Sequence, residues 1–340
     1  MSTCPFCTAP IDAQPTAGLA VCAACANPYV VEAQGQSVKT AAPHGAQDLR
    51  EIAKPGSIGG EILKALPAAL EELPVLPEIS QRVMTLLRDP DMSMSDLADL
   101  IRQDQVIAIR ILQLANSAMY GGLQEIKDLN AACSRLGTRT IANAVQAVAN
   151  GNLYITGNEA FRERMQQLWR HAVATAHCAY ELAAVLAEPR ADELFVAGLI
   201  HDIGRVVLLD IVANQYRGVL AEVRNEPELL EEVFSSYSPL VGLHVAIKWN
   251  LPPEFRMITY FLRNADAVPN ESVRTLTHVV ALAEAVAEVA GYGLGMPITS
   301  ILGLPSARAL GMTDMKLATV RADLDDKLAA LLEISTGKAA

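Results

Sequence analysis

Two pairs of cysteines near the start of the chain constrain the local fold more than any other feature. Cys4 and Cys7 form one Cys-x-x-Cys pair, and Cys22 and Cys25 form the second. Four thiolates bind Zn²⁺ tetrahedrally, and a hairpin that joins two such pairs brings the four ligands together. We therefore expect residues 1–32 to fold as a small β zinc ribbon around one structural Zn²⁺. A thioredoxin-type redox pair is the alternative, but no strand–helix pattern surrounds the cysteines.

The rest of the chain divides by composition and periodicity. Residues 33–58 are polar and rich in small residues, Pro and Gly, which predicts a flexible linker. From Gly59 onward, apolar residues repeat at helical spacing. Hydrophobic residues make up 51% of the chain and aromatic residues only 5%, and this Ala- and Leu-rich balance favours helices over strands. We expect a mainly α protein, with a helical domain over 59–300 and a C-terminal helical extension over 301–340.

Local signals place some of the helices. Ser93 and Asp96 form a capping-box pattern, and Asp104 is positioned to cap the helix that follows. Helices joined by short turns pack into a layered bundle. Longer periodic stretches predict single helices over 129–150, 191–212 and 314–335.

Charge and hydropathy exclude several classes of partner. The formal net charge is -11, and residues 1–32 contain no Lys or Arg, so we do not expect nucleic acid as a partner. The N-terminus lacks the basic and apolar regions of a signal peptide. The most apolar stretch, residues 194–213, is interrupted by charged side chains, so no membrane span is expected. These features predict a cytoplasmic protein.

Several motifs follow one another in a fixed order over about residues 60–300. They are LPVLPE (73–78), LRDPD (87–91), DLADLIRQD (96–104), RILQLANSAMYG (110–121), AACSRLG (131–137), LWRH (168–171), FVAGLIHDIGR (195–205) and WNLPP (249–253). This series resembles the HDOD family, whose name means HD-related output domain. The resemblance implies an all-helical fold related to the HD phosphohydrolases and a role in bacterial signal transduction, without a settled catalytic activity.

The same resemblance identifies a residual HD site. His171, His201 and Asp202 match positions of the HD metal site, and Glu284 stands where the late helix of the family usually offers an aspartate. An active site of this type needs several imidazoles and carboxylates around one or two metal ions.

Other positions depart from the HD pattern. Ser238 replaces a histidine of catalytic relatives, and Leu262 with Arg263 replaces a His-His pair. Leu262 cannot bind a metal, and the charge of Arg263 would oppose one nearby. A two-metal site is therefore not expected, and neither is a metal ion at the HD site in addition to the Zn²⁺ of the ribbon. We expect the retained residues to form a buried, hydrogen-bonded polar cluster, and a site for one weakly held metal ion is the alternative.

The main hypothesis is a non-catalytic signalling or scaffold protein whose degenerate HD domain binds a protein partner or a small nucleotide second messenger. The alternative is a metal-dependent phosphohydrolase that acts on a nucleotide or a cyclic dinucleotide, with Glu284 completing a minimal site. A nucleic-acid regulator that works through the ribbon is a third hypothesis, which the charge disfavours. Cys133 and Cys178, within predicted helices, are expected to be buried and inert.

Overall fold

Helices account for most of the protein. The computed structural model describes residues 18–21, 28–31, 37–39, 56–73, 77–87, 89, 91–122, 124, 126–214, 218–294, 298, 300–322 and 324–336. Within these ranges, every regular element from residue 56 onward is helical, which confirms the mainly α fold. In the same part of the chain, no helix combines the length and the apolar character that crossing a membrane requires.

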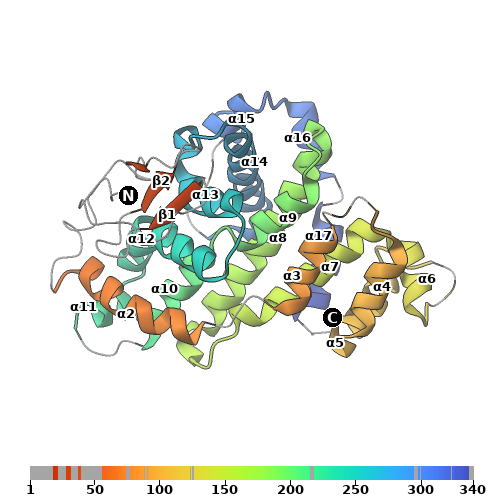
Figure 1. The fold of residues 1–340 in the computed structure, drawn as a ribbon, viewed down its shortest axis with the longest axis horizontal. Helices are drawn as coiled ribbons and strands as arrows, with labels where there is room; N and C mark the ends of the chain where they lie inside the picture. Colours follow the sequence, from red (N-terminus) through yellow and green to blue (C-terminus); the bar gives the residue numbers. More distant parts are fainter. Residues whose placement is uncertain are drawn as a thin grey trace. The chain divides into compact units, whose positions relative to one another are not determined.

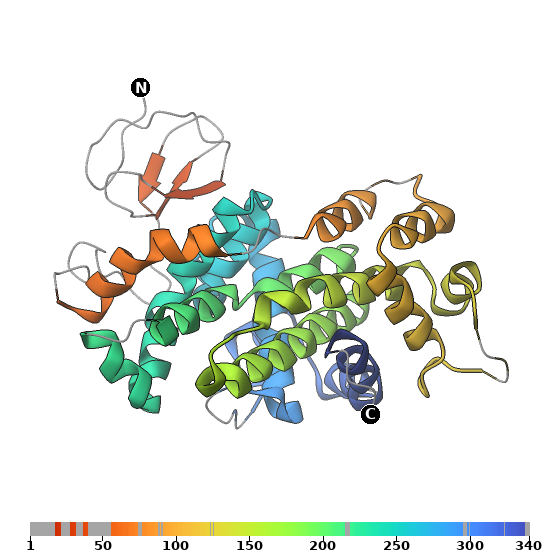
Figure 2. The same cartoon turned by 90° about the horizontal axis from the view of Figure 1, so that it is seen from below.

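Three short strands precede the helices and are drawn in red in Figure 2. They form one antiparallel sheet in the order β1-β2-β3, in which Val31 of β2 lies opposite Gly18 of β1 and Ser37 of β3. The strands are β1 (Gly18–Val21), β2 (Pro28–Val31) and β3 (Ser37–Lys39). The four cysteines of the predicted zinc ribbon lie outside the described residues, so the ribbon stays a prediction.

The chain divides into two compact units. The first comprises Met1–Leu73, Asn158–Phe161 and Ile200–Ala281. Within it, α10 packs along α12, and α2 lies against α10, α11 and α12 (Figure 1). Its helical elements are α2 (Ile58–Glu72), η2 (Glu159–Phe161), α10 (Ile203–Asn214), α11 (Val219–Asn225), α12 (Pro227–Lys248), α13 (Pro253–Phe261), η3 (Leu262–Ala267) and the first part of α14 (Glu271–Ala287).

The second unit comprises Pro74–Gly157, Arg162–Leu199 and Leu282–Ala340. Its last helix, α17, packs against α5, α7 and α8. The unit contains α3 (Glu78–Leu86), α4 (Met94–Arg102), α5 (Gln105–Ala115), α6 (Leu129–Leu136), α7 (Thr138–Asn150), η1 (Gly151–Tyr154), α8 (Arg162–Leu186), α9 (Ala191–Ile200), the end of α14, the π-helix η4 (Glu288–Tyr292), α15 (Pro305–Ala309), α16 (Asp314–Arg321) and α17 (Leu324–Thr336).

The predicted helix caps are present. Ser93 Oγ accepts a hydrogen bond from the Asp96 amide at 3.2 Å, and the Asp96 carboxylate accepts one from the Ser93 amide at 2.9 Å. This reciprocal pair satisfies two of the amide groups that a helix start leaves open. Asp104 caps α5 by accepting from the amides of Val106 and Ile107. Both helix starts were therefore readable from local sequence.

Three stretches predicted as single helices are wrong, because each is broken into two. The stretch 129–150 ends its first helix at Gly137, whose φ of 78° is a conformation that favours glycine. The stretch 191–212 is interrupted by a two-residue turn at His201 and Asp202. The stretch 314–335 breaks after Arg321, where Ala322 is extended. Apolar periodicity carries across such short breaks, so it does not reveal them.

The closest helix packing in the first unit depends on glycine. A Cβ placed on Gly204 of α10 would overlap the Ser238 carbonyl oxygen and lie 2.7 Å from the Gly242 nitrogen, both in α12. A Cβ on Gly242 would lie 2.6 Å from the Thr259 methyl group of α13. Only glycine lets these helix backbones approach so closely.

This packing makes Gly204 sensitive to the smallest substitution. We expect Gly204→Ala to lower the free energy of unfolding by on the order of 3 kcal/mol, because backbone atoms of α12 cannot yield as a side chain can. Gly157→Ala is the matched control, since a Cβ there meets nothing within 4 Å. Urea denaturation followed by circular dichroism measures both. Equal stability of the two variants would contradict the proposed role of Gly204.

Candidate functional site

His201 and Asp202 occupy the turn between α9 and α10. His201 is 2% exposed and Asp202 is 6% exposed. The Arg205 amide donates to the Asp202 carbonyl at 2.8 Å, so α10 starts directly after this pair. The Asp202 carboxylate therefore lies at a helix N-terminus, whose partial positive charge favours a buried anion. His201 Nε2 lies 3.7 Å from Asp202 Oδ2.

His171 lies in the middle of α8 and is 1% exposed. Its Nδ1 is 2.9 Å from the backbone carbonyl oxygen of Tyr292. A carbonyl only accepts hydrogen bonds, so Nδ1 carries the proton and Nε2 keeps its lone pair in the neutral ring. Backbone carbonyls hold many metal-binding histidines in this tautomer.

Glu284 is supplied by α14 and is 9% exposed. The chain continues from α14 into the π-helix η4, where Gly291 has a φ of 92°. The last residue of that π-helix is Tyr292, which accepts from His171. One continuous stretch therefore provides both an acidic group and the carbonyl that orients an imidazole. π-helical turns are frequent at functional sites.

The four residues converge. One potential ligand atom from each of His171, His201, Asp202 and Glu284 lies within 4.8 Å of the others. Metal bonds of about 2.0–2.2 Å place two ligands of one ion about 3.3–3.6 Å apart in a tetrahedron and at most about 4.4 Å apart in any geometry. Side-chain movements of up to about 1 Å would therefore bring these atoms to the spacing of a single ion. Two imidazoles and two carboxylates suit Zn²⁺, Fe²⁺ or Mn²⁺ and match a divalent charge, so the donor set fits the metal that the resemblance implies.

The positions that depart from the HD pattern supply no further donors of the same kind. Ser238 in α12 is 8% exposed and offers only a hydroxyl. Leu262 is 6% exposed and apolar. Arg263 is exposed.

Arg205 is the cation at this site, and the sequence analysis assigned it no role. It is 8% exposed, and its Nε lies 3.1 Å from Asp202 Oδ2. The signal in the sequence was the spacing of three residues between Asp202 and Arg205, because residues i and i+3 share a helical face and can form an ion pair. Periodicity does not reveal that the pair is buried.

The other histidines of the described residues, His177, His244 and His278, are not members of the cluster. His177 is 6% exposed, and burial lowers its pKa to about 4. Its contact of 3.5 Å with Glu181 therefore involves a neutral ring at pH 7. Burial also lowers the pKa of His244. His278 contacts Asp266 at 3.3 Å, and burial lowers its pKa although the carboxylate opposes the shift.

The two cysteines of the helical region are unreactive by position. Cys133 and Cys178 are both free and fully buried. Burial raises the pKa of both thiols, that of Cys178 to about 12. The thiolate is the reactive form, so the expectation of inert thiols is confirmed in this respect.

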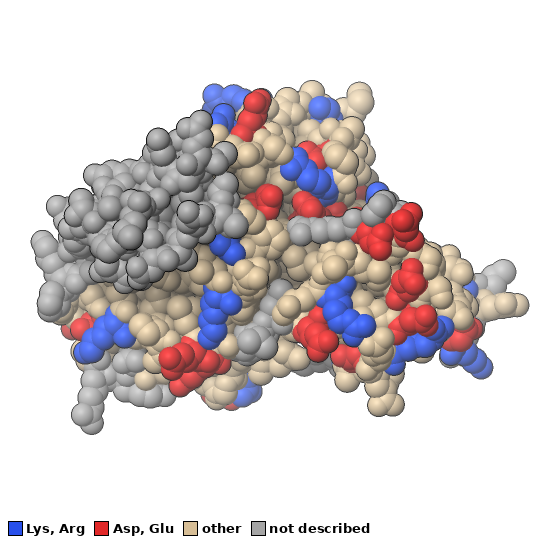
Figure 3. Space-filling view, viewed as in Figure 1, with Lys and Arg blue, Asp and Glu red and all other residues tan. Residues whose placement is uncertain are grey.

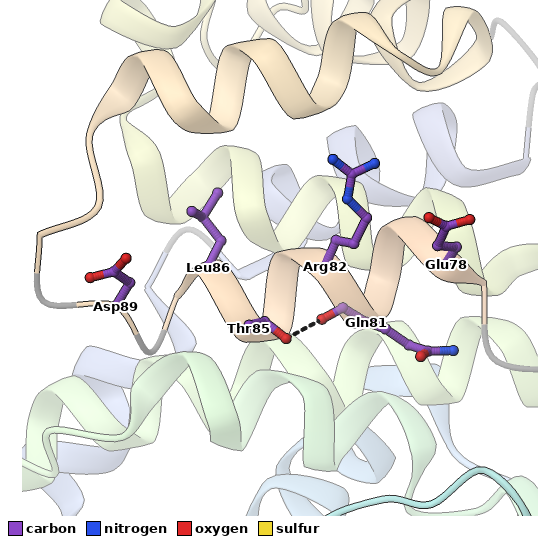
Figure 4. A pocket seen from close by; sticks show the side chains of 6 residues that line it. All are labelled: Glu78, Gln81, Arg82, Thr85, Leu86 and Asp89. Carbon is purple, nitrogen blue, oxygen red and sulfur yellow. Dashed lines mark hydrogen bonds between the residues drawn. The ribbon is translucent and has the colours of Figure 1, made fainter.

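A shallow hollow elsewhere in the second unit is lined by α3 and the turn after it. Figure 4 shows the side chains of Glu78, Gln81, Arg82, Thr85, Leu86 and Asp89 around it. Arg82 donates to Gln103 at 2.6 Å. The hollow is open and has no enclosed floor or converging donors.

The surface charges of the described residues are mixed. On the face drawn in Figure 3, Lys and Arg side chains are interspersed with Asp and Glu, without one large basic area.

Comparison with known proteins identifies the region that contains most of this site. The family model of the HDOD domain matches residues 73–265. A Treponema pallidum protein described only as uncharacterized is 27% identical over 208 residues, which cover 59% of this chain and 40% of that protein. The chain thus matches less than half the length of that relative.

Solved structures share the fold. An HDOD domain protein of unknown function from Geobacter sulfurreducens is 26% identical with a TM-score of 0.65, covering 80% of this chain and 99% of that one. A putative signal transduction protein from Marinobacter aquaeolei is 19% identical with a TM-score of 0.61, covering 86% and 69%. A putative metal-dependent phosphohydrolase from Shewanella amazonensis is 23% identical with a TM-score of 0.56, covering 83% and 99%. The last two show likeness of fold alone.

The low pKa of His177 predicts a specific loss of stability in acid. An unfolded histidine takes up a proton near pH 6.5, whereas folded His177 resists protonation until about pH 4. The contribution of His177 to the free energy of unfolding is therefore fully present above pH 6.5 and is lost as the pH falls toward 4. Between pH 7 and pH 4.5, the free energy of unfolding should therefore fall by roughly 2 kcal/mol less in His177→Gln than in the unmodified protein.

Urea denaturation at the two pH values measures this difference. His278→Gln is the comparison variant, because the Asp266 carboxylate opposes the effect of burial there, and it should change the pH dependence less. An unchanged pH dependence in His177→Gln would contradict the assignment of a neutral, buried ring.

Proposed function

Because the chain belongs to the HDOD family, we propose that it is a bacterial signalling or scaffold protein that acts by binding rather than by hydrolysis. The observation that carries the proposal is the composition of the HD site. Its converging donors suffice for one metal ion, while Ser238 and Leu262 offer no imidazole for a second. The fold shared with a putative signal transduction protein agrees with this role.

His171, His201, Asp202 and Glu284 would hold the single ion. When bound, the ion supplies positive charge that joins four side chains from separate helical segments. The Tyr292 carbonyl keeps the proton of His171 on Nδ1 and so leaves Nε2 for the metal. In this proposal the ion stabilises the conformation that a protein partner or a nucleotide second messenger recognises.

The N-terminal segment adds a second contact surface in this proposal. Cys4, Cys7, Cys22 and Cys25 bind one structural Zn²⁺ and form a ribbon. Strand β3 (Ser37–Lys39) lies within the predicted linker of residues 33–58 and pairs with β2. The cysteine spacing supports this arrangement. The acidic charge of the chain favours protein over nucleic acid as the partner of the ribbon.

A metal-dependent phosphohydrolase is the second candidate. It is favoured by the convergence of two histidines with two carboxylates and by the name of the Shewanella amazonensis protein with the same fold. Hydrolysis of a nucleotide or a cyclic dinucleotide would need a metal-bound water beside the substrate phosphate. Ions at two sites are the common way to stabilise both the attacking and the leaving oxygen.

Elemental analysis distinguishes the two metal sites. Full-length protein purified without chelator should contain one zinc per chain, and one further divalent ion per chain once it is equilibrated with MnCl₂. Replacing Cys4 and Cys22 by Ser should remove only the zinc, while Asp202→Asn combined with Glu284→Gln should remove only the other ion. Zinc retained in full by the cysteine variant would exclude the ribbon site.

Phosphate release tests the absence of catalysis. We expect the Mn²⁺-loaded protein to hydrolyse nucleoside triphosphates, cyclic di-GMP and cyclic di-AMP no faster than its His201→Ala/Asp202→Ala variant. The physical reason is that a single ion, at an HD site where Ser238 and Leu262 replace histidine ligands, stabilises only one side of the displacement. Release that is at least tenfold faster in the unmodified protein would establish the phosphohydrolase instead.

A further inference from the structure

Arg205 is a buried cation that contacts charged groups of the first unit. It projects from the first turn of α10, one turn after Asp202. Its Nε lies 3.1 Å from Asp202 Oδ2, and its Nη1 lies 3.7 Å from Glu231 Oε2 in α12. The guanidinium carbon is 5.7 Å from the centre of the Phe234 ring, also in α12. Two carboxylates and an aromatic face therefore surround one guanidinium.

The two carboxylates do not share the cation equally. The side chain of Asp202 is 8% exposed, whereas that of Glu231 is 36% exposed. Charges interact more strongly when they are closer and less hydrated, so Arg205 pairs mainly with Asp202. A buried carboxylate without a partner is strongly unfavourable, and Arg205 provides that partner within the protein itself.

A divalent ion in the His171, His201, Asp202 and Glu284 cluster would meet this cation. The ion and the guanidinium carry the same sign of charge and compete for one carboxylate. Arg205 offsets part of the negative charge that Asp202 and Glu284 present to an ion. Arg205 therefore lowers the attraction of the cluster for a divalent ion.

We propose that Arg205 is the built-in counter-ion of Asp202 and sets the metal affinity of the cluster. It stabilises Asp202 when no metal is bound and weakens binding of a single divalent ion, so that the ion exchanges readily. This inference rests on the proposed function in one respect, that the cluster binds a metal. Glu231 acts through Arg205, because its ion pair with the guanidinium weakens the interaction of Arg205 with Asp202.

Variants of Arg205 separate an electrostatic role from a structural one by the sign of the effect. We expect Arg205→Gln to bind Mn²⁺ about tenfold more tightly than the unmodified chain, a change of about 1.4 kcal/mol. Arg205→Lys retains the charge and should bind Mn²⁺ as the unmodified chain does. Loss of packing around Arg205 alone would instead weaken binding, because the ligands would be held less firmly.

Glu231→Gln is an independent variant at an accessible position. It should weaken Mn²⁺ binding about threefold, because Arg205 then pairs with Asp202 alone and competes more strongly with the ion for that carboxylate. Arg256→Gln is the matched control, because Arg256 bonds to the Leu251 carbonyl at 2.7 Å and to the Asn250 side chain, away from the cluster. It should leave Mn²⁺ affinity unchanged.

Isothermal titration of full-length protein with MnCl₂ measures these affinities, and Mn²⁺ competes poorly for a thiolate site. A second readout is thermal stability. Metal-free Arg205→Gln should melt at a lower temperature than the metal-free unmodified protein. Saturating Mn²⁺ should raise the melting temperature of Arg205→Gln by more than it raises that of the unmodified protein.

Tighter binding in Arg205→Gln together with weaker binding in Glu231→Gln supports the counter-ion role. Unchanged or weaker binding in Arg205→Gln overturns it, even if the unmodified chain binds one Mn²⁺. If Arg205→Gln does not fold, unchanged binding in Glu231→Gln overturns it equally. Absence of Mn²⁺ binding in every variant overturns both this role and the proposed metal site.

Discussion

The approach of α10 to α12 at Gly204 is the constraint on which the candidate site depends. Gly204 stands between Asp202 and Arg205 in the sequence, and its missing side chain lets the start of α10 contact α12. That contact brings Glu231 and Phe234 of α12 to the Arg205 guanidinium. A side chain at Gly204 would separate these groups. The environment of the Asp202 carboxylate is therefore determined by backbone packing, with the polar contacts following from it.

Local sequence predicted the parts of the fold that local interactions decide. The capping box at Ser93 and the cap at Asp104 formed as expected, because a cap needs only neighbouring residues. The breaks at Gly137 and at the His201–Asp202 turn were missed. Both flanking helices bury apolar faces, so the periodic pattern continues through each break. Tertiary packing, rather than helix propensity, decides where such helices end.

The candidate site was only partly visible in the sequence. The family resemblance selected His171, His201, Asp202 and Glu284, and the structure places their ligand atoms near one another. Convergence of residues so far apart along the chain cannot be deduced from their spacing in the sequence. Tyr292 was not detectable, because its contribution is a backbone carbonyl placed by a π-helix. Arg205 was visible as a residue, but its burial between two carboxylates was not.

Charge balance connects the fold to the choice between one metal ion and two. A second divalent ion needs additional anionic or imidazole ligands, and Ser238 and Leu262 provide neither. In their absence, a protein cation is the simplest group that can neutralise the buried Asp202 carboxylate. Arg205 meets that requirement at 3.1 Å, and it cannot leave as a metal ion can. A tethered cation beside a single metal position leaves fewer positions for activating water, and this supports the proposal of recognition over hydrolysis.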